Sequence, residues 1–150
     1  MSNRVFAAYG VGLNRAEMAK HCPTARPIGT TDLKNFRLAF RGCNACAVAT
    51  IEKTKGSSVP ILLWETTLQD EAALDRWIGV PELYRKDMVK VRLNGAAMDA
   101  FVYILIGNKP PNKPSAFYYS TLLEGFKAAG FDTEILKVAV QFNSADVATT

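Results

Sequence analysis

A two-residue turn, Asn94-Gly95, separates two strand-like segments in the second half of the chain, residues 84–93 and 98–106. Asn and Gly both accept the positive φ angles of a type I′ turn, whose twist matches that of two paired strands. The two segments are therefore predicted to form an antiparallel hairpin. It is the strongest short hairpin signal in the chain, and it places at least one antiparallel pair in the fold.

Other strands are expected from short apolar or alternating runs that end at turn residues. The runs cover residues 5–9, 28–40, 47–52 and 59–65, and the second contains one bent strand or two short ones. Lys55-Gly56-Ser57-Ser58 is a turn signal between the last two runs. These runs predict a sheet with short connections.

Helices are predicted where capping residues precede an apolar period. Asn14 and Glu17 have the spacing of a capping box, and so do Thr67 and Asp70. Two more helices are expected at residues 115–129 and 132–142. With no repeat and no linker, residues 1–150 form one domain. The predicted fold is α+β, a largely antiparallel sheet that can close into a small barrel with helices around it.

Composition narrows the possible partners. Of the 150 residues, 49% are apolar and 21% charged, which allows one sizeable core. The longest apolar stretch, residues 101–107, is too short to cross a bilayer, and no signal-peptide pattern is present. We therefore expect a cytoplasmic protein without a membrane partner. The net charge of +4 is spread along the chain, which favours small anions and argues against a nucleic-acid polymer.

The segment after the first predicted strand can bind an anion. It reads Tyr-Gly-Val-Gly-Leu-Asn at residues 9–14 and leads into a helix. Gly10 and Gly12 can take positive φ and let a ligand approach the main chain. Backbone N–H groups at such a turn, beside a helix N-terminus, form a concavity for carboxylate or phosphate. Two glycines in such a turn are more often only a tight connection.

A second segment, residues 74–86, makes the turn at residues 9–14 more than a tight connection, because the two segments together match one family. It reads Leu-Asp-Arg-Trp-Ile-Gly-Val-Pro-Glu-Leu-Tyr-Arg-Lys. Together the two segments resemble the anion-binding and acid-bearing loops of the gamma-glutamylcyclotransferase-like family, also called AIG2-like. The resemblance covers most of the chain. It extends through Cys22-Pro23, Ala25, Leu33, Phe36-Arg37-Leu38, Phe40, Ala49-Thr50-Ile51, residues 59–64, Gly79 and Tyr103.

The resemblance implies a small β-barrel with helices around it and a cavity at one end. It also implies an enzyme that cyclises a gamma-glutamyl group to 5-oxoproline. In the family the second segment usually runs Leu-Asp-x-x-Glu-Gly, and its Glu moves the protons. Here that position is Ile78, and Val11 and Gly12 replace the usual polar pair of the first segment.

Ile78 cannot carry out the proton transfers that this cyclisation needs. The attacking amine is mostly an ammonium near neutral pH, so a group must take its proton and return one to the leaving nitrogen. A positioned carboxylate typically gains about 10²- to 10⁴-fold in this way. Glu82 is the fallback acid, because it follows closely in a loop. Asp75, Glu65 and His21 are interpreted as surface or capping residues.

Three cysteines, Cys22, Cys43 and Cys46, do not suggest a disulfide framework. Cys43 and Cys46 have C-x-x-C spacing, and His21 and Cys22 could complete four zinc ligands. Without a second C-x-x-C this interpretation is the weaker one. We expect neither a metal nor a cofactor.

The sequence thus favours a non-catalytic protein that binds an anionic small ligand, of carboxylate, phosphate or nucleotide type, and sequesters it. The alternative is an active gamma-glutamyl cyclotransferase that uses a displaced acid. A third possibility is a homo-oligomer built through the C-terminal helices, for example at Leu122, Phe126, Leu136 and Val140, although their spacing fits docking on the sheet better. The expected ligand-binding residues are Tyr9, Gly10, Val11, Gly12, Leu13, Asn14, Ile78, Tyr84, Arg85 and Tyr118.

Overall fold

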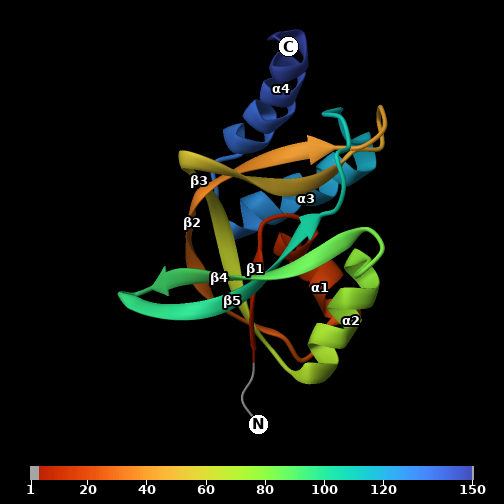
Figure 1. Ribbon diagram of the computed structural model, residues 1–150. Helices are drawn as coiled ribbons and strands as arrows, with labels where there is room; N and C mark the ends of the chain where they lie inside the picture. The colour runs from red at the N-terminus through yellow and green to blue at the C-terminus, as the bar shows by residue number, and fades with distance from the viewer. Residues whose placement is uncertain (1–3, 150) are drawn as a thin grey trace.

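The fold is mixed α and β. A computed structural model describes the backbone of residues 4–149 and the side chains of residues 4–141. In chain order the elements are β1 (Arg4–Ala8), the 3-10 turn η1 (Val11–Leu13), α1 (Arg15–His21), β2 (Arg26–Arg41), β3 (Val48–Thr66), α2 (Leu68–Ile78), β4 (Tyr84–Leu93), β5 (Ala96–Leu105), α3 (Ala116–Ala129) and α4 (Glu134–Thr149). Figure 1 shows α1 and α2 together on one side of the strands, with α4 at the end opposite the N-terminus.

The strands form one sheet in the order β2-β3-β1-β5-β4. All neighbours are antiparallel except β1 and β5, which run parallel. The expected barrel is wrong, because no strand pairing joins the edge strands β2 and β4 within the described residues. These edges meet through side chains instead. A Cβ atom on Gly29 of β2 would lie 2.8 Å from a methyl of Leu93 on β4, so packing rather than a hydrogen-bonded ladder brings the edges together.

The predicted turn at residues 55–58 is also wrong, because β3 continues through it as one strand of 19 residues. The pairing of β3 with β2 jumps from Lys34↔Ser58 to Phe36↔Lys53, so that residues 54–57 bulge opposite Asn35. Gly56 and Asn35 take positive φ angles of 87° and 69°, and the Asn35 Oδ1 accepts the Gly56 N–H at 3.2 Å. The glycine therefore marks a bulge in a strand.

The predicted hairpin and the capping box of α2 are confirmed, whereas at α1 the Asn14 side chain accepts the Glu17 N–H without the reciprocal hydrogen bond of a box within the described residues. Asn94 and Gly95 have φ angles of 53° and 84°, and Leu93 pairs with Ala96, as a two-residue type I′ turn requires. Thr67 and Asp70 form both hydrogen bonds of a capping box at the start of α2. Gly79 ends that helix in the left-handed conformation. These local signals place α2 and β4 correctly along the chain.

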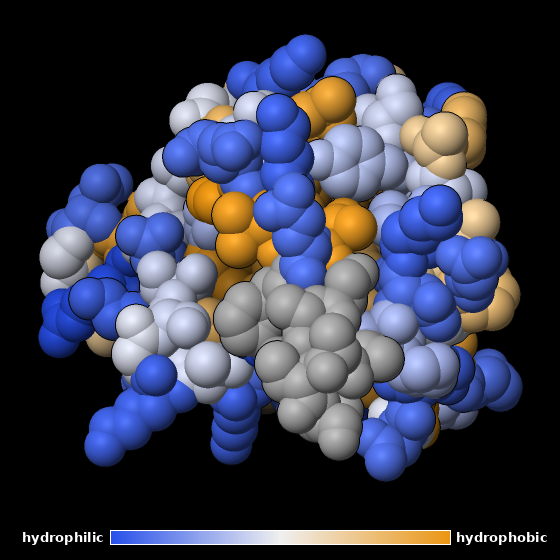
Figure 2. All heavy atoms as spheres, turned by 90° about the horizontal axis from the view of Figure 1, so that it is seen from above, coloured by the Kyte–Doolittle hydropathy of each residue, from blue (hydrophilic) through white to orange (hydrophobic). Residues whose placement is uncertain are grey.

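The C-terminal helices complete the core. Leu122, Phe126 and Leu136 are fully buried, so they dock within the domain and are unavailable for an oligomer contact. On the surface, Phe117 is 83% and Val138 53% exposed. Figure 2, seen from the α4 end, shows a mostly hydrophilic face with a small group of hydrophobic residues beside the grey atoms. Oligomerisation therefore stays a prediction.

Two further features concern the cysteines and the membrane. Cys43 and Cys46 form a disulfide across a turn, so they are joined to each other and do not offer thiolates to zinc. Cys22 is a buried free thiol that donates to the Asp70 carbonyl at 3.5 Å.

Within the described residues, no helix has both the length and the hydropathy needed to cross a bilayer.

Candidate functional site

The segment between β1 and α1 is held rigidly against the sheet. The Leu13 and Asn14 N–H groups donate to the carbonyls of Gly10 and Val11 at 2.9 and 3.0 Å, which forms a single 3-10 turn. The buried Trp64 indole donates to the Gly12 carbonyl at 3.0 Å. The Asn14 Oδ1 caps α1 by accepting the Glu17 N–H at 3.1 Å. The backbone of this turn is therefore fixed before any ligand arrives.

The two glycines of this turn have a different role from the one expected. Gly10 has a φ of −128°, and Gly12 is not among the glycines with positive φ, so the expected left-handed backbone is wrong. Gly12 is needed for close packing, because a Cβ atom there would lie 2.8 Å from the Phe6 ring. The N–H groups of Val11 and Gly12, at the start of the 3-10 turn, have no acceptor among the described residues. Two backbone donors are thus available to an anion.

A small cavity lies between this turn, the end of α2, the first turn of α3 and four strands, β1, β3, β4 and β5. Its volume is about 30 Å³, enough for one small group or a water molecule or two. It contains seven of the ten predicted ligand-binding residues. The lining residues are Phe6, Ala7, Tyr9, Gly10, Val11, Gly12, Ala49, Ile78, Tyr84, Tyr103 and Tyr118.

Phenol groups dominate the polar chemistry of the cavity. Tyr84 donates to the Ala49 carbonyl at 2.7 Å, and Tyr118 accepts the Ala49 N–H at 3.0 Å. The Tyr9 hydroxyl donates to the Tyr103 carbonyl at 2.5 Å. Burial raises the pKa of Tyr118 to about 12 and raises the pKa of Tyr9, Tyr84 and Tyr103 further still. All four phenols therefore stay protonated near neutral pH and cannot act as bases. Tyr9, Tyr84 and Tyr103 already donate their single hydroxyl proton within the protein, so Tyr118 is the phenol that can donate to a ligand.

A charged network lies directly behind the cavity. The Tyr103 hydroxyl donates to Asp75 at 2.7 Å, and the Lys86 ammonium bridges Asp75 and Glu71 at 3.0 and 2.6 Å. Arg4 also pairs with Glu71, at 3.0 Å. The interpretation of Asp75 as a surface carboxylate is therefore wrong. Glu71 and Asp75 are four residues apart on α2, so helical spacing alone places them on one face and could have revealed the pair.

The remaining predicted residues lie outside the cavity. Leu13 is fully buried in the core, and the Asn14 side chain donates to the Thr121 carbonyl at 3.1 Å. Arg85 is exposed and pairs with Asp87 at 3.2 Å on the other face of β4. It follows Tyr84 directly, and consecutive side chains of a strand point to opposite faces. Glu82 is exposed in the segment after α2 and does not line the cavity.

Two other candidate acids or bases have structural partners. His21 stacks on Trp77, with the ring centroids 4.1 Å apart. Glu65 pairs with Arg26 at the surface. Neither residue lines the cavity. Phe6, Ala7 and Ala49, which do line it, were missed because short apolar strand residues carry no signal of a site.

Solved structures share this architecture. An uncharacterized protein from Homo sapiens is 24% identical, with a TM-score of 0.80 over 93% of this chain and 87% of that chain. A gamma-glutamyl cyclotransferase is 23% identical, with a TM-score of 0.78 over 92% of this chain and 86% of that one. YkqA from Bacillus subtilis is 20% identical, with a TM-score of 0.79, and this chain spans 55% of its length. The fold is therefore gamma-glutamylcyclotransferase-like.

The sequence itself gives the family. The model of the AIG2-like family matches residues 58–137, more than half of the chain, so the protein belongs to that family. No curated protein matches the chain.

Proposed function

We propose that this AIG2-like protein binds the carboxylate or phosphate group of a small ligand and does not transform it. The observation that carries the proposal is the chemistry of the cavity lining. Within the described residues the lining contains no Asp, Glu, His, Lys or Cys, and it includes the apolar Ile78. By the family resemblance, Ile78 stands where the family has its acid. The cyclisation expected of the family needs a group that exchanges protons near neutral pH. The buried phenols are too weakly acidic to take that place.

The same lining supports binding of a small anionic group. Val11 and Gly12 line the cavity, and their N–H groups have no acceptor among the described residues. A backbone concavity of this kind favours an anion, and the neutral Tyr118 hydroxyl can add a hydrogen bond. The volume of about 30 Å³ limits what enters. A carboxylate can fit, whereas the body of a larger ligand, such as a nucleotide, would extend outside the cavity.

Binding without turnover suits sequestration of the ligand. The test is a native mass spectrum of protein purified from cell extract, followed by denaturation and identification of any released molecule. We expect an unchanged carboxylate or phosphate compound at near-stoichiometric amounts. Failure to retain any such compound from several extracts would contradict the proposal.

A pair of variants at one position tests the backbone donors. Val11→Pro removes the N–H at the first position of the 3-10 turn, where proline is sterically tolerated. Val11→Ala shortens the side chain but keeps the N–H. We expect Val11→Pro to lose the retained compound and Val11→Ala to keep it, with both variants showing the circular dichroism of the parent. Equal retention by the two variants would exclude the backbone N–H as the anion donor.

A gamma-glutamyl cyclotransferase with a displaced acid is the second candidate. The hydrogen bond from Tyr103 to Asp75 favours it, because this carboxylate is one side chain away from the cavity. Release of 5-oxoproline from gamma-glutamyl amines measures it directly. Multiple turnovers by the parent protein that Asp75→Asn abolishes and Glu82→Gln leaves intact would establish this activity. They would also overturn the binding-only proposal.

A further inference from the structure

A groove of about 390 Å³ lies on the other face of the sheet from the tyrosine cavity. It forms because β1 has only five residues and pairs with β3 only at residues 62–66. Beyond the end of β1, β3 and β5 have no strand between them. The gap is bridged by one side chain, since the Thr50 hydroxyl accepts the Leu105 N–H at 3.0 Å. The groove is therefore a consequence of the sheet topology.

Strand alternation separates the groove from the cavity. Ala49, Tyr84 and Tyr103 line the cavity, and the residues that follow them, Thr50, Arg85 and Ile104, line the groove. Successive side chains of a strand point to opposite faces, so the same stretches of backbone support both. A ligand in the groove would contact a set of side chains entirely different from those of the cavity.

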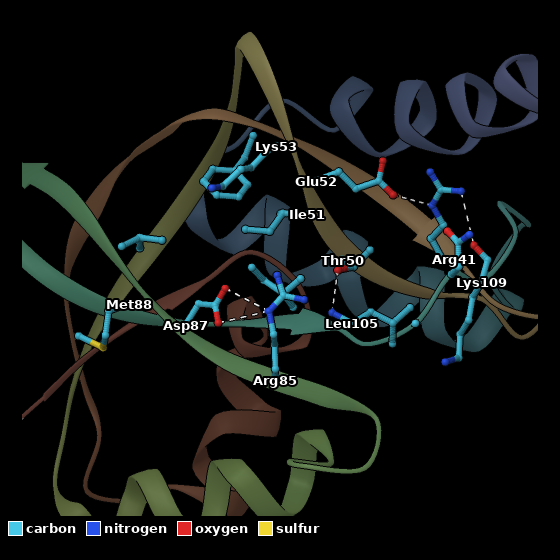
Figure 3. A pocket seen from close by; sticks show the side chains of 15 residues that line it. Arg41, Thr50, Ile51, Glu52, Lys53, Arg85, Asp87, Met88, Leu105 and Lys109 are labelled. Carbon is cyan, nitrogen blue, oxygen red and sulfur yellow. Dashed lines mark hydrogen bonds and ion pairs between the residues drawn. The ribbon is translucent and has the colours of Figure 1, made fainter.

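The groove carries an excess of positive charge. Figure 3 shows Arg85 and Asp87 rising from β4, Glu52 and Lys53 on β3, and Arg41 and Lys109 at one end. Four cationic side chains face two carboxylates, which leaves a net charge of +2. The four cations are Arg41, Lys53, Arg85 and Lys109.

These cations keep donors available for a ligand. Arg85 contacts Asp87 through Nε, so its two terminal nitrogens are not used in that pair. Lys53 has no acidic partner among the described residues. A guanidinium with free terminal N–H groups matches the geometry of phosphate oxygens.

The wall of the groove is fixed by contacts with β2. The Arg41 guanidinium contacts Glu52 at 2.5 Å and donates to the Lys109 carbonyl at 3.5 Å. The Gly42 N–H donates to the Pro110 carbonyl at 2.9 Å, and Asn112 donates to the Gly42 carbonyl at 2.7 Å. The connector after β5 is therefore attached to the end of β2, and the Arg41 side chain is held before a ligand binds.

The other part of the groove is apolar. Phe36, Ile51, Met88 and Val89 lie along it, and Met88 is 53% exposed. A groove of a few hundred Å³ that combines charged groups with apolar walls has the form of a small-molecule site. The expected ligand has an anionic end and an apolar body.

We propose that this groove binds a phosphate-bearing small molecule with an apolar or aromatic body, as a site separate from the tyrosine cavity. The phosphate contacts Arg85, and the body lies against Met88 and Val89. The proposal goes beyond the function proposed above, because it requires neither the turn at residues 10–14 nor Ile78.

The probe is phenyl phosphate, titrated by calorimetry and by two-dimensional NMR of the labelled protein, with inorganic phosphate and neutral phenol as comparison compounds. We expect saturable binding of phenyl phosphate, weaker binding of inorganic phosphate and none of phenol. Amide shifts should move at Lys53, Asp87 and Met88 and stay in place at Val11 and Ile78. Affinity should fall as salt is added. Absence of saturable binding, or shifts confined to the cavity, would overturn the proposal.

Variants on one strand make the test specific. Arg85→Met removes a groove cation, and Arg92→Met removes an exposed arginine of the same strand that lies outside the groove. We expect a loss of affinity on the order of tenfold for the first and little change for the second. Asp87→Asn removes the competing carboxylate and should bind several-fold tighter, a gain that misfolding cannot produce. Equal affinities of Arg85→Met and Arg92→Met, or no gain for Asp87→Asn, would contradict it.

Discussion

Gly125 connects α3 to the backbone of the turn at the cavity, and its substitution by alanine tests that connection. A Cβ atom at Gly125 would lie 2.8 Å from the carbonyl carbon of Leu13 and 2.9 Å from the nitrogen of Asn14. Ordinary contacts of a Cβ atom begin near 3.4 Å, so the turn would have to move by several tenths of an ångström. That movement would strain two hydrogen bonds, from the Glu17 N–H to the Asn14 cap and from the Trp64 indole to the Gly12 carbonyl.

Two effects of opposite sign decide the outcome of Gly125→Ala. Alanine gains about 1 kcal/mol of helix propensity over glycine. Overpacking costs about 1–3 kcal/mol, and the upper part of this range applies because two of the close atoms belong to the backbone. We therefore expect the free energy of unfolding to fall by about 1–2 kcal/mol.

Urea denaturation measures this difference. Ser120→Ala, at an exposed position of the same helix, is the matched control and should stay within about 0.5 kcal/mol of the parent. An unfolding free energy of Gly125→Ala at or above that of the parent would refute the reasoning. It would mean that the turn at residues 10–14 moves at little cost and is not held rigidly by its hydrogen bonds.

Three further outcomes are expected. Tyr84→Phe removes the 2.7 Å hydrogen bond to the buried Ala49 carbonyl and should cost about 1–2 kcal/mol in urea denaturation, whereas Tyr119→Phe should be nearly neutral. Ile78→Glu places a carboxyl in half-buried, apolar surroundings, which raises its folded-state pKa above the unfolded value of about 4.3. Its stability relative to the parent should therefore fall between pH 4 and pH 7, and equal differences at both pH values would contradict this. The buried tyrosines have pKa values raised from 10.0, to about 12 for Tyr118. Stability should thus be unaffected by these phenols below pH 10 and should fall above it, with phenolate absorbance appearing together with the loss of circular dichroism.

The sequence predicted local structure well wherever one residue type determines a backbone angle. Asn94-Gly95, the Thr67 cap and Gly79 all behave as predicted, because their preferences are properties of one to four residues. Gly56 led to a wrong prediction of a turn, because a local preference for positive φ does not distinguish a turn from a bulge. A left-handed glycine fits both a turn and a bulge, and only the pairing of β2 with β3 distinguishes the two.

Long-range arrangement was harder to predict. Barrel closure depends on whether the edge strands β2 and β4 form backbone hydrogen bonds or only pack side chains, and no local sequence pattern predicts this. The family resemblance predicts that Tyr9, Val11 and Ile78 lie together, and they do line one cavity, together with the rim candidate Tyr118. Arg85, expected at the rim because a guanidinium can pair with an anion, lies outside the cavity, because it follows Tyr84 on β4 and points to the opposite face.

The shared strands have an evolutionary consequence. On each of β3, β4 and β5, one adjacent pair has one residue in the cavity and the other in the groove: Ala49 and Thr50, Tyr84 and Arg85, and Tyr103 and Ile104. Point mutations can therefore change the chemistry of one face while leaving that of the other alone. An insertion of a single residue in β4 would exchange the two sets along that strand, so descendants of this protein should vary there by substitution and seldom by length.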